Sequence, residues 1–221
     1  GHMRKLAATK GKPIYYFPFS VDLDLLPKRK WASRADIVGF TGSADEYLYP
    51  HRVQAAQRLA DADLLHDARA RWQTVSKKRW HWRGQRLSQS AINHHDVAEG
   101  VKFRKYAQID PRDYFEYLAS FKIVLTCASN CQLVLNKDYE IPAAGAVMLT
   151  DGGTPGLDEI LPAGSYLKYY NPDDVVRVVR RALANPQELQ ARARLARDHV
   201  HEYHSDAVRT VQLEGILEEL R

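Results

Sequence analysis

The chain has 221 residues, of which 45% are hydrophobic and 27% are charged, and its formal net charge is +5. This length and composition allow a substantial buried core, so we expect one large folded domain and exclude a disordered chain. No apolar run approaches the roughly 18 residues of a membrane-spanning helix, and no signal-peptide pattern is present.

The first clear elements are a strand and a helix. The apolar run at 37–41 predicts a buried strand. A helix is predicted to follow from Pro50, because Val53, Ala56 and Leu59 then share one helical face. This order of elements favours an α/β architecture.

The next stretch, 69–107, has poor periodicity and receives no secondary-structure prediction. Between residues 69 and 86 it holds seven Lys and Arg residues and no acidic residue, interleaved with Trp72, Trp80 and Trp82. Such a stretch can contact nucleic acid, a peripheral membrane surface or an anionic substrate. No nucleic-acid-binding motif accompanies it, so we expect no specific nucleic-acid partner.

The second half of the chain continues the alternation of strands and helices. Helix starts are predicted at three Asx-Pro pairs: Asp110-Pro111, Asn171-Pro172 and Asn185-Pro186. The Asx side chain accepts a backbone N–H at the N-cap, and proline has no N–H to leave unpaired. We expect Glu188 to complete a capping box with Asn185. Apolar runs predict three further strands, at 122–126, 146–150 and 166–169.

The two cysteines of the chain, Cys127 and Cys131, lie four residues apart after one of these strands. No second cysteine pair and no histidine at ligand spacing follows them. We therefore interpret them as reduced thiols rather than as metal ligands. Reduced cysteines favour a cytoplasmic location.

The most informative segment runs from Asn136 to Asp151. Its single carboxylate beside a small-residue turn is Glu140, and the turn, Ala143-Ala144-Gly145, leads directly into a strand. A glycine that permits close backbone approach, followed by a parallel strand, is typical of a ligand crevice at the edge of an α/β sheet. On these residues alone, a helix-to-strand corner with a solvated glutamate remains the alternative.

The ordered set of features from Tyr114 to Leu217 resembles a known family. After the glutamate come the Gly152-Gly153-Thr154 turn, a short strand ending in Tyr169, and His204-Ser205 with Arg209. This order resembles the donor-binding domain of group 1 glycosyltransferases of the two-domain GT-B type. A weaker echo lies upstream, at 17–22 and 40–52. His204 and Arg209 match the family's closing element, although plain helix-end packing is the alternative.

The resemblance implies an α/β fold, a single Rossmann-like doubly wound parallel sheet that forms one half of such an enzyme. We interpret residues 1–3 as a tag remnant, 4–36 as a lead-in segment and 37–221 as the nucleotide-sugar-binding domain. The general base of inverting members comes from an N-terminal acceptor domain, so no catalytic residue is assigned. The resemblance also implies no bound metal and no cofactor other than the nucleotide-sugar substrate itself.

The resemblance further implies a set of donor contacts. Glu140 matches the glutamate that holds the ribose of a nucleotide-sugar. Gly42, Ser43 and Arg52 match a phosphate-facing loop and the basic residue after it, although Arg52 can also be a solvated helix charge. The other candidate donor contacts are Gln132, Gly145, Gly152, Gly153 and Thr154. Many family members carry a second glutamate at the position of Gln132, so the sugar and the stereochemistry stay open.

The leading hypothesis is a donor-binding domain that supplies a nucleotide-sugar to a glycan or lipid-linked acceptor held by a missing N-terminal domain. A second hypothesis, favoured by Gln132, is a non-catalytic nucleotide-sugar-binding module. A third, based on the tryptophan-rich basic stretch, is an adaptor that associates with nucleic acid or a membrane surface.

Overall fold

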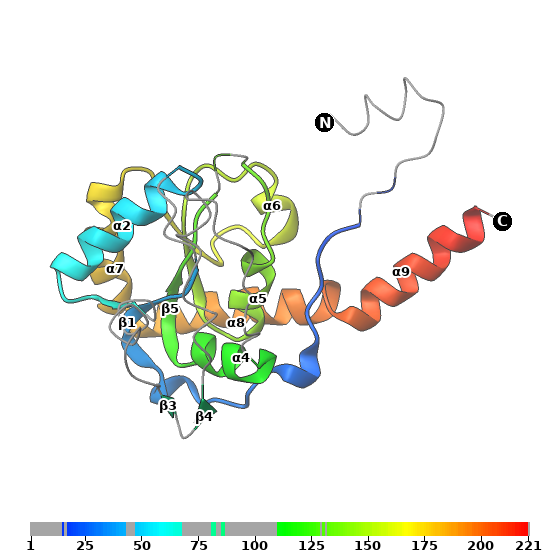
Figure 1. Ribbon diagram of the computed structural model, residues 1–221, viewed down its shortest axis with the longest axis horizontal. Coiled ribbons are helices and arrows are strands. Elements are labelled where there is room, and N and C mark those ends of the chain that lie inside the picture. Colours follow the sequence, from blue (N-terminus) through cyan, green and yellow to red (C-terminus); the bar gives the residue numbers. More distant parts are fainter. Residues whose placement is uncertain are drawn as a thin grey trace.

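A parallel β-sheet forms the centre of the molecule (Figure 1). The computed structural model describes residues 15, 17–42, 47–67, 110–128, 130 and 132–220, together with the backbone of residues 81–82 and 85–86. The sheet has five strands in the order β2-β1-β5-β6-β7, and all of its neighbouring pairs are parallel. These strands are β1 (Ala35–Phe40), β2 (Leu65–Asp67), β5 (Phe121–Leu125), β6 (Val147–Asp151) and β7 (Leu167–Tyr169).

Helices cover both faces of this sheet. The α-helices of the described part are α2 (Pro50–Asp61), α4 (Pro111–Ala119), α5 (Lys137–Ala143), α6 (Leu157–Ile160), α7 (Val175–Leu183), α8 (Pro186–Tyr203) and α9 (Asp206–Glu219). Short 3-10 turns are η1 (Leu23–Leu25), η2 (Trp31–Ser33) and η5 (Pro172–Asp174). None of the helices in the described ranges is long and apolar enough to cross a membrane.

The sequence predictions of strand positions are confirmed to within two residues, and the predicted doubly wound parallel sheet is confirmed. The one strand of this sheet that was not predicted is β2, which has only three residues and therefore shows no periodicity. From the basic stretch, the structure describes only the backbone of the antiparallel pair β3 (His81–Trp82) and β4 (Gln85–Arg86). The hypothesis of a membrane or nucleic-acid surface there lies outside the described residues.

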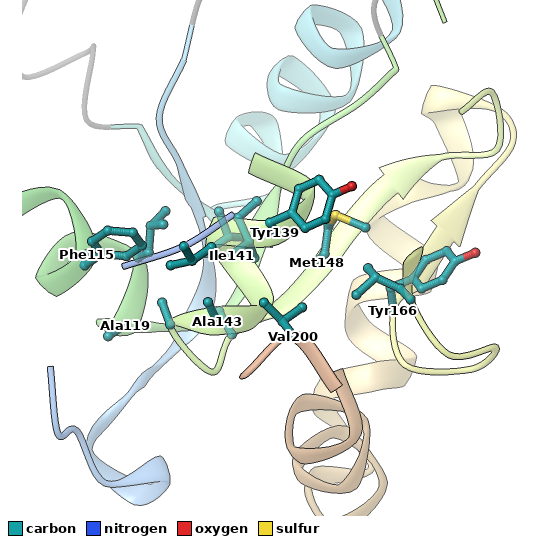
Figure 2. Close-up of a cluster of buried hydrophobic side chains, with 14 of the residues drawn as sticks. Phe115, Ala119, Tyr139, Ile141, Ala143, Met148, Tyr166 and Val200 are labelled. Atoms are coloured by element: carbon teal, nitrogen blue, oxygen red, sulfur yellow. The ribbon is translucent and has the colours of Figure 1, made fainter. Parts of the chain in front are cut away.

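Two hydrophobic cores lie on opposite faces of the sheet. The alternation of side chains along β6 illustrates this, because Val147 and Leu149 enter one core and Met148 the other. The core that contains Met148 packs against α4 and α5 and includes Phe115, Tyr139 and Val200 (Figure 2). The other core packs against α2, α7 and the first half of α8. Together these layers hold the strand ends in fixed positions.

Two of the three predicted Asx-Pro helix starts cap as expected. Asp110 and Asn171 each accept a hydrogen bond from the backbone N–H two residues later, at 2.9 and 3.0 Å. At the third, α8 begins at Pro186 as predicted, but the predicted cap is wrong, because the Asn185 side chain donates instead to the carbonyl of Arg181 in the preceding helix. The predicted capping box is wrong as well, because Glu188 pairs with Arg192 one helical turn further on.

The lead-in segment is bound to the domain rather than separate from it. Val21 is buried, and its backbone pairs with His204 and Asp206 at 3.0 and 3.1 Å. Arg209, also buried, donates from Nε to the carbonyl of Pro18 at 3.1 Å. His204 and Arg209 thus fasten the lead-in segment to the junction of α8 and α9, which agrees with the packing alternative for this pair. From this junction α9 extends away from the sheet (Figure 1).

We predict that Gly39→Ala destabilises the fold. A Cβ at this position of β1 would lie 2.7 Å from Cγ of the buried Phe121, so the ring or the strand must shift. We expect a loss of at least about 1 kcal/mol in the free energy of unfolding, measured by denaturant titration. Gly215→Ala in α9 is the control, because nothing lies within 4 Å of its Cβ position. Equal stability of the two variants would contradict the close approach of β1 and Phe121.

Candidate functional site

The carboxyl ends of the parallel strands define the edge at which a ligand can bind. The strand order reverses between β1 and β5. The strand that follows β1 in the chain, β2, lies on one side of β1, and the next strand of the sheet, β5, lies on its other side. In doubly wound sheets, ligands bind in the crevice at such a switch point. The loops that follow β1 and β5 meet here, since the backbone N–H of Asn130 donates to the carbonyl of Leu48 at 2.9 Å, and α2 and α5 begin after these loops.

A cavity of about 680 Å³ lies at this edge. The lead-in segment forms one wall, and the first turns of α2, α4, α5 and α9 form the others. Its lining residues are Phe19, Ser20, Val21, Asp22, Leu25, Tyr49, Arg52, Pro111, Tyr114, Phe115, Leu135, Asn136, Lys137, Glu140 and Asp206. Helix N-termini carry partial positive charge and unpaired backbone N–H groups, so this arrangement favours an anion.

Arg52 supplies a full positive charge to the cavity. It occupies the first turn of α2, and the residue is only 2% exposed, so the alternative of a solvated helix charge is wrong. Its guanidinium carbon lies 3.7 Å from the centre of the Tyr49 ring, a cation–π contact. No acidic residue accompanies it in this turn, where the helix dipole disfavours a cation. A charge kept at a position that costs helix stability indicates a role in function.

Gly42 brings the loop after β1 against two cationic side chains. A Cβ at Gly42 would lie 3.4 Å from Nη1 of Arg52 and 3.5 Å from Cε of Lys137. The φ of Gly42 is 147°, which side-chain-bearing residues rarely adopt. A glycine therefore suits this position both sterically and conformationally. Ser43, the next candidate residue, lies outside the described residues.

Glu140 belongs to a hydrogen-bonded group of three side chains. The Tyr114 hydroxyl donates to Oε2 of Glu140 at 2.7 Å and accepts from Nζ of Lys137 at 3.0 Å. Burial lowers the pKa of Lys137 to about 8, and the charge of Arg52 acts in the same direction. Burial, followed by the charge of Glu140, raises the pKa of Tyr114 well above its usual value. The phenol thus stays protonated and orients the carboxylate.

Sequence reasoning missed Lys137 and Tyr114. Lys137 precedes Glu140 by three residues, a spacing that places both on one helical face, so this signal was available in the sequence. Tyr114 comes from α4, and no local spacing indicates that it meets α5. Asp138 was missed as well: it is buried, next in sequence to the cavity-lining Lys137, and accepts from the backbone N–H of Leu135 at 2.8 Å. Burial raises the pKa of Asp138 to about 7.

Three candidate residues, Gly152, Gly153 and Thr154, follow β6 at the same edge of the sheet but do not line the cavity. A Cβ at Gly152 would lie 2.6 Å from Cδ1 of Tyr170, so a side chain there would have to displace this exposed ring. Gly153 and Thr154 continue the turn beyond Asp151, whose Oδ1 accepts from the backbone of Ala128 at 2.8 Å.

The remaining two candidates lie apart from the cavity. Gln132 is exposed in the loop after β5, with a φ of 51°. Gly145 follows the far end of α5, where its φ is 75° and a Cβ would lie 2.9 Å from Nη2 of Arg34. Gly145 thus serves the turn between α5 and β6. The structure therefore brings together Glu140, Arg52 and Gly42 from the predicted set.

Cys127 is a free, buried thiol, and burial raises its pKa to about 12. Its thiol is therefore protonated at neutral pH, which fits the interpretation as a reduced cysteine. Cys131 lies outside the described residues. Within the described ranges, no group of three or more His, Cys, Asp or Glu residues is placed to hold a metal ion.

Comparison with known protein families decides the assignment. Residues 62–215, more than half of the chain, match the family described as glycosyl transferase-like. The chain belongs to this glycosyl transferase-like family. The predicted resemblance to group 1 glycosyltransferases of the GT-B type is thereby confirmed. A comparison with curated proteins found no match.

Several solved structures share the fold of this family member. Sucrose-phosphate synthase from Thermosynechococcus elongatus is 14% identical with a TM-score of 0.59, and the match covers 99% of this chain and 56% of that one. HepE from Anabaena, in complex with UDP-glucose, is 11% identical with a TM-score of 0.56, covering 90% and 56%. TarM is 13% identical with a TM-score of 0.53, covering 97% and 42%. The chain thus spans about half the length of these structures.

Proposed function

We propose that this chain is the donor-binding half of a GT-B glycosyltransferase and that its cavity binds a nucleotide-diphosphate sugar. One observation carries the proposal: a buried cation, Arg52, and an oriented carboxylate, Glu140, face one cavity at the switch point of the sheet. The structures of HepE with UDP and with UDP-glucose support the ligand class for a protein of this fold. Family membership supports the reaction class.

Each part of such a donor has a matching partner in the cavity. The two ribose hydroxyls can donate to the Glu140 carboxylate, in charge-assisted bonds worth about 1.5–3 kcal/mol each. The diphosphate can accept from Arg52 and from backbone N–H groups at the helix N-termini. When the bond between the sugar and the diphosphate breaks, negative charge builds up on the leaving diphosphate. The same cation and dipoles stabilise that charge without having to reorganise.

The acceptor site and any general base are proposed to lie in a part of the protein beyond this chain, since the chain spans about half the length of its structural neighbours. A glycan or a lipid-linked sugar is the acceptor class that we propose. The non-catalytic alternative rests on Gln132 at a position where many family members have glutamate. We also propose a cytoplasmic location, supported by the free thiol of Cys127.

The proposed function is tested by ligand-induced thermal stabilisation with UDP, GDP, ADP, UDP-glucose and the free nucleosides. A ligand present at about 100 times its Kd adds roughly 2.7 kcal/mol to the stability, which shifts the unfolding temperature measurably. We expect one nucleoside diphosphate to stabilise the chain more than its nucleoside does. Absence of any shift would contradict the proposal. Equal stabilisation by unrelated polyanions, lost at high salt, would instead favour the basic adaptor.

We also predict that donor binding is independent of metal ions. The chain has Asp-x-Asp sequences at Asp22-Leu23-Asp24 and Asp61-Ala62-Asp63, but one carboxylate of each pair is engaged locally. Asp22 caps η1, because its side chain accepts from the backbone N–H of Asp24 at 2.9 Å. The Asp61 side chain accepts from the side-chain amide of Gln57 at 2.7 Å. The Kd for the nucleoside diphosphate is therefore expected to be the same in EDTA and in Mg²⁺. Binding that is lost in EDTA and restored by Mg²⁺ or Mn²⁺ would refute metal independence.

A further inference from the structure

We propose, on the basis of the proposed function, that Lys137 is a second cation of the donor site and binds the diphosphate together with Arg52. Through this contact it selects nucleoside diphosphates over nucleosides and makes donor affinity dependent on pH. Neither the resemblance nor the family match assigns a role to this residue.

Lys137 lies at the wall of the cavity, close to Arg52. It is the first residue of α5, next to Asn136, and both line the cavity. Its Cε and the guanidinium of Arg52 flank the same point, the missing Cβ of Gly42, at 3.5 and 3.4 Å. Two cations from different helices therefore converge on one loop. A diphosphate ester, which carries two negative charges, matches that pair.

Tyr114 is the hydrogen-bond partner of the Lys137 side chain. The Lys137 ammonium group lies 5.0 Å from the centre of the Tyr114 ring and donates to the phenol oxygen at 3.0 Å. That phenol stands between Lys137 and Glu140, because it donates its own proton to the carboxylate at 2.7 Å. The lysine charge is thus held by a neutral hydroxyl. Among the described residues the ammonium group makes no other hydrogen bond, so two of its three N–H donors are available to a ligand.

A lysine on the outermost strand β7 offers a comparison. Lys168 on β7 also lies 5.0 Å from a tyrosine ring, that of Tyr166, but it is 3.6 Å from the carboxylate of Asp158 and outside the donor cavity. The pKa of Lys168 is raised, first by its hydrogen bond with Tyr166. The pKa of Lys137 is instead lowered to about 8 by burial. Withdrawing an ammonium group from water, even partly as for Lys137, costs free energy, and a bound anion would offset that cost.

The pH dependence follows from the sign of this shift. In the empty site the charge of Lys137 is complete well below pH 8 and is lost above it; a bound diphosphate favours the charged form and raises the pKa. Affinity is therefore full below pH 8 and falls as the pH rises above it. Among the described residues, the charged and titratable groups around Lys137 are Tyr49 and Arg52 at the start of α2, Tyr114 of α4, Asp22 of the lead-in segment, Asp206 of α9, and Asp138 and Glu140 of its own helix. Variants of Lys137 separate its titration from theirs.

The experiment measures Kd by calorimetry for UDP, GDP and ADP and for the matching nucleosides, at pH 7 and pH 9. Lys137→Met removes the charge but keeps an apolar chain of similar length. It is expected to weaken nucleoside diphosphate binding by about tenfold at pH 7 and to leave nucleoside binding unchanged. Lys137→Arg is expected to retain binding at pH 7 and to lose the fall between pH 7 and pH 9, because arginine does not titrate there. Lys168→Met is the matched control and is expected to behave as the wild type.

The outcomes separate this inference from the proposed function. A wild-type chain that binds none of the three diphosphates overturns both. A wild-type chain that binds, with Lys137→Met unchanged in affinity and in pH profile, overturns only the assignment of Lys137. Equal losses for diphosphate and nucleoside indicate a merely structural lysine and overturn it too. If thermal unfolding shows that Lys137→Met does not fold, Lys137→Arg still tests the assignment. If the affinity of Lys137→Arg falls above pH 8 as much as that of the wild type, the titration of Lys137 is not the cause and the assignment is refuted.

Discussion

Arg52→Met is expected to lower the affinity for a nucleoside diphosphate by about 100-fold or more, close to 3 kcal/mol. The buried guanidinium can make two charge-assisted bonds to the diphosphate, and methionine replaces neither of them. The fold should survive, because methionine has a similar length and leaves no unpaired charge at this buried position. Calorimetry measures the Kd, and thermal unfolding verifies the fold.

The control for this variant is Arg58→Met on the same helix. Arg58 is exposed and pairs with Asp173 at 2.8 Å, away from the cavity, so its removal should leave binding unchanged. The free nucleoside provides a second control, since it has no phosphate and should bind both variants as it binds the wild type. Diphosphate affinity within a factor of about three of the wild type in Arg52→Met, under 1 kcal/mol, would remove Arg52 from the site.

Glu140→Ala is expected to weaken nucleoside diphosphate binding by about 30-fold, roughly 2 kcal/mol, through loss of the carboxylate that accepts from the ribose. The nucleoside should lose a similar factor, in contrast to the Arg52 and Lys137 variants, because the ribose is common to both ligands. The 2′-deoxynucleoside diphosphate sharpens the measurement. The wild type should discriminate against it, and Glu140→Ala should not.

The matched control is Glu116→Ala on α4. Glu116 lies 3.6 Å from Arg29 and does not line the cavity, so its loss should leave affinity unchanged. Loss of the Glu140 carboxylate also leaves the Tyr114 hydroxyl without its acceptor. Thermal unfolding of Glu140→Ala therefore has to show an intact fold. Retained discrimination against the 2′-deoxy ligand in a folded Glu140→Ala would refute ribose binding by this residue.

Much of the fold could be predicted from local sequence because local forces determine it. The buried strands at 37–41, 122–126 and 146–150 were predicted from apolar runs, since a parallel sheet covered on both faces needs apolar side chains throughout. The caps at Asp110 and Asn171 depend only on neighbouring backbone groups. The cap at Asn185 failed because the carbonyl of Arg181, in the preceding helix, offered a competing partner.

The sequence determined some of the site residues, and the tertiary structure determined the others. The sequence by itself determined the family, the parallel sheet, and the choice of Glu140 and Arg52 as candidate residues, because these depend on residue type and order along the chain. Gly145 could have been excluded from the site by sequence, because it directly precedes the predicted strand at 146–150 and therefore lies at the amino ends of the parallel strands, opposite the crevice.

Only the tertiary structure decided which side chains meet. The lead-in segment becomes a wall of the cavity through its pairing with the α8–α9 junction, more than 180 residues away in the chain. Tyr114 joins Lys137 to Glu140 across two helices, and burial among these helices is what lowers the pKa of Lys137 to about 8. Burial and charge–charge interactions depend on every element packed around a group, and no local pattern of residues encodes them.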